Sequence, residues 1–427
     1  MRIWIAALLT ALTTASPLAA QQLAVHSSIR PEIRPSDLLT PDLLTPDLQP
    51  TQVSAASQPG FARWVQGFRK RALAQGIRAQ IFDAAFRGVR YDAGIVAKDR
   101  NQSEFTKQIW DYLDTAVSGA RVKNGRAAVA KHNAVLSRIE ARYGVEKEIV
   151  AAIWGLETSY GAFFGNTNTI QALATLAYDP RRSAFFEQQT LDALRILQAG
   201  DTKGLQGSWA GAMGHTQFMP TSYIAHAQDF NRDGRRDIWG KDPTDALAST
   251  AAYLQHNGWK KGQPWGLEVI LPKGFDYSNS TERVKKPVNF WTRQGVRLVN
   301  GKQIPNHGRA SILLPAGHRG AAFVIFGNFQ VLETYNTADA YVIGVGHLAD
   351  RLAGAGPIKG NWPRADKPLS FTEKQQMQRR LLSKGFDPDG LDGIIGPNTI
   401  AAVQAFQKAI GVVPDGYVSK ELLARLR

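Results

Sequence analysis

The stretch Glu148-Ile-Val-Ala-Ala-Ile-Trp-Gly-Leu-Glu-Thr-Ser-Tyr-Gly161 decides which fold this chain adopts. As a helix it places Val150, Ile153 and Glu157 on one face, at spacings of three and four residues. That face is otherwise apolar, so the carboxyl of Glu157 is predicted to be partly buried at the end of the helix. Burial disfavours a charged carboxyl, and a raised pKa of Glu157 would suit a general acid. The alternative is a glutamate turned to solvent or paired with an arginine.

The rest of the 427-residue chain is expected to fold into two or three domains of mainly α (α+β) class. Apolar residues recur at helical spacings from about 61 to 198 and from about 338 to 352. Between them, 267–271, 296–299 and 322–326 are typical of short strands separated by turns. A small β-rich insertion in a helical domain is therefore predicted.

The N-terminus carries the pattern of an export signal. Arg2 precedes a short apolar run, and Leu18-Ala-Ala20 offers a cleavage site, so residues 1–20 are predicted to be a signal peptide. The alternative is an N-terminal membrane anchor, although the apolar run is too short to span a bilayer. Residues 21–57 repeat Asp-Leu-Leu-Thr-Pro and are predicted to be a proline-rich linker.

Charge and composition narrow the class of protein. The chain has no cysteine, which excludes disulfides, thiol chemistry, thiolate metal sites and a lipid on an N-terminal cysteine. A net charge of +15 favours an acidic polymer. No basic block or nucleic-acid motif is present, so nucleic acid is not expected as a partner. With an export signal, the expected location is the periplasm and the expected polymer is peptidoglycan, whose peptide stems carry carboxylates.

A second informative stretch runs from Gly207 to Tyr223 and combines glycines, a hydroxyl, an amide, methionines and aromatic rings. This mixture suits a sugar-binding cleft, because aromatic faces stack on pyranose rings and Ser208 and Gln217 can hydrogen-bond sugar groups. The alternative is a loop with ordinary core anchors. Met213, Phe218 and Met219 are interpreted as packing residues, and His215 as part of the cleft wall or core.

Together, the stretches 154–161 and 211–220 resemble the membrane-bound lytic transglycosylase B family, and the resemblance covers about 58–353. It implies a lysozyme-like helical catalytic domain and Glu157 as the single catalytic carboxylate. Tyr335-Asn336 followed by Tyr341 matches a third, shorter motif. The cleft residues implied by the resemblance are Ser208, Gln217, Tyr253, Tyr335, Asn336 and Tyr341.

The reaction implied by this resemblance needs no cofactor and no water. Glu157 would protonate the glycosidic oxygen between N-acetylmuramic acid and N-acetylglucosamine, and would then take the proton of the C6 hydroxyl that attacks C1. Because the nucleophile belongs to the substrate, proximity replaces the second carboxylate of ordinary glycosidases. The alternatives are a hydrolytic muramidase and a non-catalytic peptidoglycan-binding protein.

An acidic segment begins at Asp229 with the spacing of a calcium-binding loop. Oxygen ligands at positions 1, 3 and 5, glycine at position 6 and a backbone carbonyl at position 7 open an EF-hand loop. Position 12 is glycine here, so a late ligand would come from Asp242 or Asp245. A structural calcium ion is one expectation, and a loop held by Asp-to-backbone hydrogen bonds is the other. The expected ligands are Asp229, Asn231, Asp233, Arg235 and Asp245.

The C-terminal segment 369–427, after a second linker at 354–368, contains a repeat with an offset of 26 residues. It is similar to the small three-helix peptidoglycan-binding module, which would hold an enzyme near its polymer. Pro397 is predicted to begin its second helix, and Gly411 to end that helix. Its predicted core consists of Leu381, Ile400, Val403, Phe406 and Ile410.

Overall fold

The computed structural model describes residues 57–100 and 107–427. The predicted signal peptide and nearly all of the predicted linker 21–57 lie outside these residues. Among the helices of the described part, none has the length and apolar character needed to cross a membrane.

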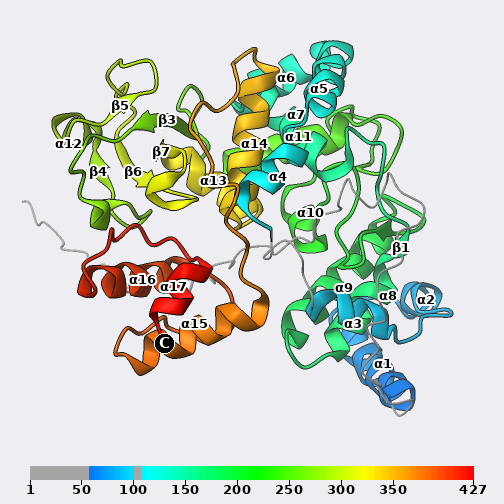
Figure 1. Cartoon of the computed structure of the whole chain (residues 1–427). Helices are drawn as coiled ribbons and strands as arrows, with labels where there is room; N and C mark the ends of the chain where they lie inside the picture. Colours follow the sequence, from blue (N-terminus) through cyan, green and yellow to red (C-terminus); the bar gives the residue numbers. More distant parts are fainter. Residues whose placement is uncertain (1–56, 101–106) are drawn as a thin grey trace, which may run out of the picture.

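Helices dominate the chain up to residue 352 (Figure 1). Several ends have local causes: Ser118 and Asn168 accept backbone N–H groups at two helix starts, and Gly144 and Gly200 adopt left-handed conformations at two helix ends. The helices are α1 Ser57–Ala74, α2 Ala79–Ala85, α3 Ala93–Arg100, α4 Ile109–Ala116, α5 Gly119–Lys131, α6 Asn133–Tyr143, α7 Lys147–Thr158, α8 Thr169–Tyr178, α9 Ser183–Ala199, α10 Pro220–His226, α11 Thr244–His256, α12 Val288–Arg293, α13 Gly327–Tyr335 and α14 Asp339–Leu352.

The helix α7 lies inside this helical part, where it packs against α14, α5, α11 and α6. Val150 and Ile153 are completely buried, as the sequence pattern predicted. Small residues on the other faces of α7, such as Ala151 and Ala152, are buried as well. A helix that is apolar on nearly all sides is covered on nearly all sides, so α7 is a fixed frame for the side chains at its end.

The β-rich insertion forms an antiparallel sheet with the strand order β4-β6-β7-β3-β5. The three predicted strands are confirmed as β3, β5 and β7. The sequence did not predict β6, because its run Arg-Ala-Ser-Ile-Leu lacks a clear alternation. The strands are β1 Thr167–Asn168, β2 Gln206–Gly207, β3 Gly266–Ile270, β4 Lys286–Pro287, β5 Arg297–Leu298, β6 Arg309–Leu313 and β7 Ala322–Ile325, of which β1 and β2 form a separate pair.

The C-terminal segment folds around its own small core of buried residues that include Met377, Leu381, Val403 and Phe406. Its helices are α15 Phe371–Ser383, α16 Pro397–Ala409 and α17 Lys420–Arg425. Pro397 begins α16, as predicted.

One predicted core residue of this segment is wrong. Ile410 is 40% exposed, and Ile400 is only partly buried. The reason is that α16 ends at Ala409 and that Gly411, with φ 71°, turns the chain immediately afterwards. Ile410 therefore leaves the buried face of the helix.

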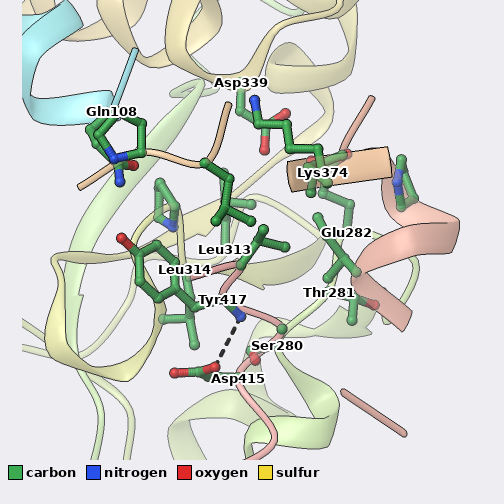
Figure 2. Close-up of a pocket in the computed structure, with 18 of the residues that line it drawn as sticks. Gln108, Ser280, Thr281, Glu282, Leu313, Leu314, Asp339, Lys374, Asp415 and Tyr417 are labelled. Atoms are coloured by element: carbon green, nitrogen blue, oxygen red, sulfur yellow. Dashed lines mark hydrogen bonds between the residues drawn. The ribbon is translucent and has the colours of Figure 1, made fainter. Parts of the chain in front are cut away.

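The C-terminal segment lies against the β-rich part (Figure 1). The backbone N–H of His318 donates to Asp415 at 3.0 Å, and Gln404 donates to the carbonyl of Tyr277 at 3.2 Å. A cavity of about 220 Å³ lies at this junction (Figure 2). Glu282, Asp339 and Lys374 line it together with apolar side chains.

Candidate active site

Three successive residues in the left-handed region end α7: Ser159, Tyr160 and Gly161, with φ of 50°, 62° and 83°. This conformation is costly for residues that carry a Cβ, and it persists where the surroundings hold it. The hydroxyl of Tyr160 donates to the carbonyl of Arg121 at 3.1 Å. A Cβ on Gly161 would lie 2.8 Å from the ring of His215, so only glycine fits there.

Glu157 is the second-last residue of α7 and is 7% exposed. The hydroxyl of Tyr341 donates to its Oε1 at 2.7 Å. Tyr341 lies on α14, which packs directly against α7. Two residues that the sequence separates by 184 positions are therefore joined by a buried hydrogen bond. Both residues belong to the motifs that resemble the transglycosylase family, but the bond between them follows only from the fold.

The second motif forms a tight loop whose polar side chains bind its own backbone. Met213 bridges both Gly207 and Phe218. Ser208 Oγ accepts the N–H of Ala212 at 3.1 Å. Gln217, with φ 52°, donates from Nε2 to the carbonyl of Gly214 at 2.9 Å.

A further bond joins this loop to the loop that follows α7, because Gln217 Nε2 also donates to the carbonyl of Phe164 at 3.2 Å. Ser208 and Gln217 are only 4% and 1% exposed. Within the described part of the chain, Oε1 of Gln217 has no hydrogen-bond partner. These two predicted cleft residues thus organise the loop, and Gln217 retains one acceptor.

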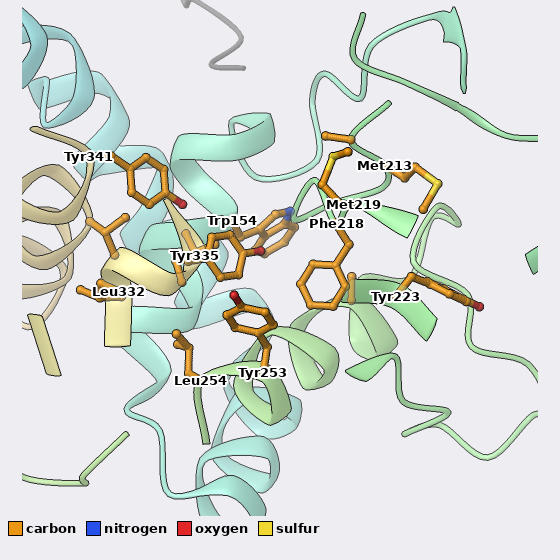
Figure 3. Close-up of a cluster of buried hydrophobic side chains, with 14 of the residues drawn as sticks. Trp154, Met213, Phe218, Met219, Tyr223, Tyr253, Leu254, Leu332, Tyr335 and Tyr341 are labelled. Atoms are coloured by element: carbon orange, nitrogen blue, oxygen red, sulfur yellow. The ribbon is translucent and has the colours of Figure 1, made fainter. Parts of the chain in front are cut away.

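The three tyrosines named by the sequence analysis lie close together (Figure 3). The rings of Tyr335 and Tyr253 are 5.2 Å apart, and those of Tyr335 and Tyr341 are 6.5 Å apart. Tyr335 is completely buried and donates to the carbonyl of Thr216, while Tyr253 donates to that of Thr334. Asn336 accepts the N–H of Ala338 at 3.0 Å, next to the start of α14.

The bond from Tyr335 to Thr216 connects the second motif to α13, and Asn336 then leads into α14, which carries Tyr341. Met213, Phe218 and Met219 are almost completely buried, as predicted for packing residues.

His215 is buried within the second motif, and both nitrogens of its ring and its backbone carbonyl contact polar groups. Its ring Nδ1 faces Nε1 of Trp154 at 3.1 Å, and its ring Nε2 faces the carbonyl of Gly240 at 2.8 Å. Its carbonyl accepts the hydroxyl of Thr158 at 2.6 Å. The sequence predicts His215 only as cleft wall or core, because Trp154 lies 61 positions away and no spacing pattern pairs the two residues.

The acidic segment brings together carboxylate oxygens of Asp229, Asp233 and Asp245, all within 4.8 Å of one another. Asn231 donates to Asp233 at 3.2 Å, and the N–H of Arg235 donates to Asp233 at 2.9 Å. Oxygen donors of this kind suit a calcium ion. Burial raises the pKa of Asp245, and the neighbouring Asp229 acts in the same direction.

The same carboxylates also accept backbone N–H groups, which was the other expectation for this loop. Asp229 accepts from Asp233 and Gly234, each at 3.0 Å, and Asp245 accepts from Phe230 at 2.9 Å.

A second group of acids, which the sequence did not predict, consists of Glu282, Glu333 and Asp339. Their carboxylate oxygens lie within 4.8 Å of one another, and Glu282 and Asp339 also line the cavity of Figure 2. Burial and then the carboxylate of Glu333 raise the pKa of Glu282 to about 8. Burial raises the pKa of Glu333 to about 7 and that of Asp339 well above its usual range. More than 50 positions separate Glu282 from Glu333, so only the fold brings them together.

Comparison with known proteins assigns families to both parts of the chain. Residues 60–350 match the transglycosylase SLT domain family, and residues 373–426 match a peptidoglycan binding domain family. The chain is 34% identical over 251 residues to the membrane-bound lytic murein transglycosylase B of Escherichia coli. That alignment covers 57% of this chain and 66% of the relative.

The solved structures that are similar to this one include the following two. The structure of SltB3 from Pseudomonas aeruginosa in complex with NAG-anhNAM-pentapeptide is 50% identical in sequence, with a TM-score of 0.83, over 86% of this chain and 99% of the other. The lytic transglycosylase Slt35 of Escherichia coli in complex with calcium is 29% identical, with a TM-score of 0.59, over 68% of this chain and 92% of the other. The lysozyme-like helical fold expected from the sequence is confirmed by these neighbours.

Proposed function

This chain belongs to the lytic murein transglycosylase B family, and on that premise we propose that Glu157 is the single acid and base with which it cleaves peptidoglycan. The observation that carries the proposal is the 2.7 Å hydrogen bond from Tyr341 to the buried carboxyl of Glu157. A donor at this oxygen stabilises the carboxylate that remains after a proton has been given away. The carboxyl is thereby held in one orientation for both proton transfers.

The bond that breaks is the β-1,4 link between N-acetylmuramic acid and N-acetylglucosamine. Protonated Glu157 gives its proton to the glycosidic oxygen, and the bond from that oxygen to C1 breaks. The muramic N-acetyl group stabilises the positive charge that develops at C1. The C6 hydroxyl oxygen then bonds to C1 and its proton passes to Glu157, which regenerates the acid and leaves a 1,6-anhydromuramic end.

The substrate is held, in this proposal, by the side chains that surround the ends of α7 and α14. Ser208, Gln217, Tyr253, Tyr335, Asn336 and Tyr341 form this group. Gln217 Oε1 has no hydrogen-bond partner among the described residues but is buried, so its proposed contact with a sugar hydroxyl or acetamido N–H requires the loop to open on binding. Tyr335 and Asn336 act mainly by fixing the wall, because their polar atoms bind the backbone.

The proposed domain organisation of the chain follows from the two matched families. Residues 58–353 would be the catalytic domain, 354–368 a linker and 369–427 the module that binds peptidoglycan. Binding of the polymer by the module raises the effective concentration of glycan strands at Glu157. Export through the signal peptide at 1–20 would deliver the enzyme to the periplasm.

A structural calcium ion in the loop that begins at Asp229 is a further part of the proposal. The carboxylates of Asp229, Asp233 and Asp245, the amide oxygen of Asn231 and the carbonyl of Arg235 are the proposed ligands. The ion would neutralise three neighbouring carboxylates and take no part in the reaction.

Mass spectrometry of the soluble products from purified peptidoglycan sacculi tests the reaction. We expect muropeptides lighter by one water than hydrolytic products, without a reducing muramic end. Reducing muramic ends would instead identify a hydrolytic muramidase. Absence of products, with the protein pulled down by sacculi, would identify a non-catalytic binding protein.

A further inference from the structure

The tautomer of His215 follows from its two ring contacts. An indole N–H only donates, so Nδ1 of His215 accepts the hydrogen bond from Trp154. The ring proton therefore sits on Nε2 and is donated to the carbonyl of Gly240. The Trp154 contact requires an unprotonated Nδ1 and therefore a neutral ring. Burial lowers the pKa of His215, which also favours the neutral ring. The titratable groups around it are His132, Asp237 and Asp242.

The contacts of His215 reach α7 at Trp154 and Thr158, and the turn after α7 at Gly161. Trp154 lies three residues before Glu157, and Thr158 directly follows it. Gly161, the last residue of the left-handed turn, is so close to the ring that it admits no Cβ. The ring thus holds the part of α7 from which the carboxyl of Glu157 projects.

On its other side, His215 is fixed to the segment that follows the acidic loop. Its backbone N–H donates to the carbonyl of Ile238 at 2.9 Å, in addition to the ring contact with Gly240. Asp237 accepts the N–H groups of Trp239 and Gly240, and its own N–H donates to Asp245 at 3.1 Å. The segment 238–240 that binds His215 is therefore connected to the acidic loop through Asp237 and Asp245.

We propose that His215 is a positioning residue: its neutral ring clamps the end of α7 to the segment 238–240 and so fixes the orientation of the Glu157 carboxyl. This inference rests on the proposed role of Glu157. In this inference His215 does not act on the reacting atoms itself, and its effect passes through Trp154 and Thr158. A misplacement of about 1 Å in a catalytic group can reduce the rate by about 100-fold.

Two substitutions separate the two ring contacts of His215, the one with Trp154 and the one with Gly240. The amide nitrogen of His215→Gln takes the place of Nε2, so this variant keeps the donor to Gly240 and loses the acceptor for Trp154. The amide oxygen of His215→Asn takes the place of Nδ1, so this variant keeps the acceptor for Trp154. Both keep the backbone bonds to Ile238 and Thr158.

The experiment measures kcat and KM on soluble glycan strands, melting temperature and sacculus binding for the full chain. We expect His215→Gln to lower kcat about 10- to 100-fold with KM within about twofold. His215→Asn loses the ring bond to Gly240 but keeps the backbone bond to Ile238, so it should lower kcat by a smaller factor than His215→Gln. Trp154→Phe removes the donor of the same bond, so it should match His215→Gln. The double variant should be no slower than either single one.

Glu157→Gln, measured alongside, separates the two hypotheses. An inactive Glu157→Gln with a fully active His215→Gln would overturn the role of His215 and leave the proposed function standing. An active Glu157→Gln would instead overturn the proposed function. If the His215 variants do not fold, nitrogen NMR of the parent chain with labelled histidine decides: a proton on Nε2 supports the clamp, and a proton on Nδ1 or a charged ring at pH 7 contradicts it.

Discussion

Glu157, which is buried, and the half-buried Glu282–Glu333–Asp339 group are two acidic sites beside α14, and they differ in what surrounds the carboxyl. Glu157 receives a hydrogen bond from a neutral hydroxyl donor, Tyr341. Glu282 instead faces two further carboxyls, which can approach one another only when they share protons. A donor partner suits a group that must alternate between acid and base, whereas mutual repulsion suits a group that stays protonated.

The two sites are connected by the chain itself, because Asp339 begins α14 and Tyr341 lies two residues later. Glu333 lies on α13, two residues before Tyr335. The strongly raised pKa values of Glu282, Glu333 and Asp339 therefore mark a structural junction away from Glu157.

Glu157→Gln should produce the largest effect. Gln cannot donate and then recover a proton, so the rate of cleavage should fall by about 1,000-fold or more. The melting temperature and sacculus binding should stay close to those of the parent chain. Glu282→Gln is the matched control, since it changes the other acidic site and should leave cleavage at pH 6 within about threefold. Equal losses of cleavage rate in Glu157→Gln and Glu282→Gln would contradict the assignment of catalysis to Glu157 alone.

Tyr341→Phe should have the next largest effect. Loss of a hydrogen bond to a charged group costs about 1.5–3 kcal/mol, which corresponds to roughly 10- to 100-fold in rate. We expect the loss in kcat, measured by release of soluble muropeptides. Tyr335→Phe removes a hydroxyl that binds the carbonyl of Thr216 instead, and it should lower stability more than kcat. A Tyr341→Phe variant with parental kcat would contradict the orienting role of Tyr341.

Calcium should stabilise a third group of carboxylates, the loop that begins at Asp229. At a free calcium concentration about 100 times Kd, a single site adds about 2.7 kcal/mol, a rise of several degrees in melting temperature. Asp245→Asn should remove most of this rise, whereas Glu282→Gln should keep it. The readout is differential scanning calorimetry with calcium or with a chelator. An identical response of Asp245→Asn and the parent would exclude the loop as the site.

The pH dependence of stability should show a smaller effect, with a defined sign. The folded-state pKa values of Glu282 and Glu333, about 8 and about 7, lie above their ordinary value of 4.5. Protons are therefore bound more tightly by the folded chain, and the associated stability is complete below pH 4.5 and is lost as the pH rises through about 7 and 8.

Glu282→Gln should reduce this loss, so that its melting temperature at pH 9 exceeds that of the parent by roughly 2–4 °C. At pH 5 the two should agree within about 1 °C. A difference that is independent of pH would show that the three carboxyls do not share protons.

Much of the candidate site was predictable because its residues lie in two short, patterned stretches. The face formed by Val150, Ile153 and Glu157 follows from helical spacing alone, and burial of Glu157 follows from its apolar neighbours. The resemblance of the motifs to a known family added Tyr341 and the surrounding tyrosines. Ile410 was misplaced because spacing does not fix the last residue of a helix.

The sequence by itself therefore determined the class of fold, the identity of the buried glutamate and the spacing of the acidic loop, since each depends on residues close together along the chain. Only the tertiary structure decided which distant groups meet: Tyr341 with Glu157, His215 with Trp154, and Glu282 with Glu333 and Asp339. Hydrogen bonds and charge interactions act over a few ångströms in space, and the packing of α7 against α14 and the placement of Glu282 beside α13 and α14 set those distances.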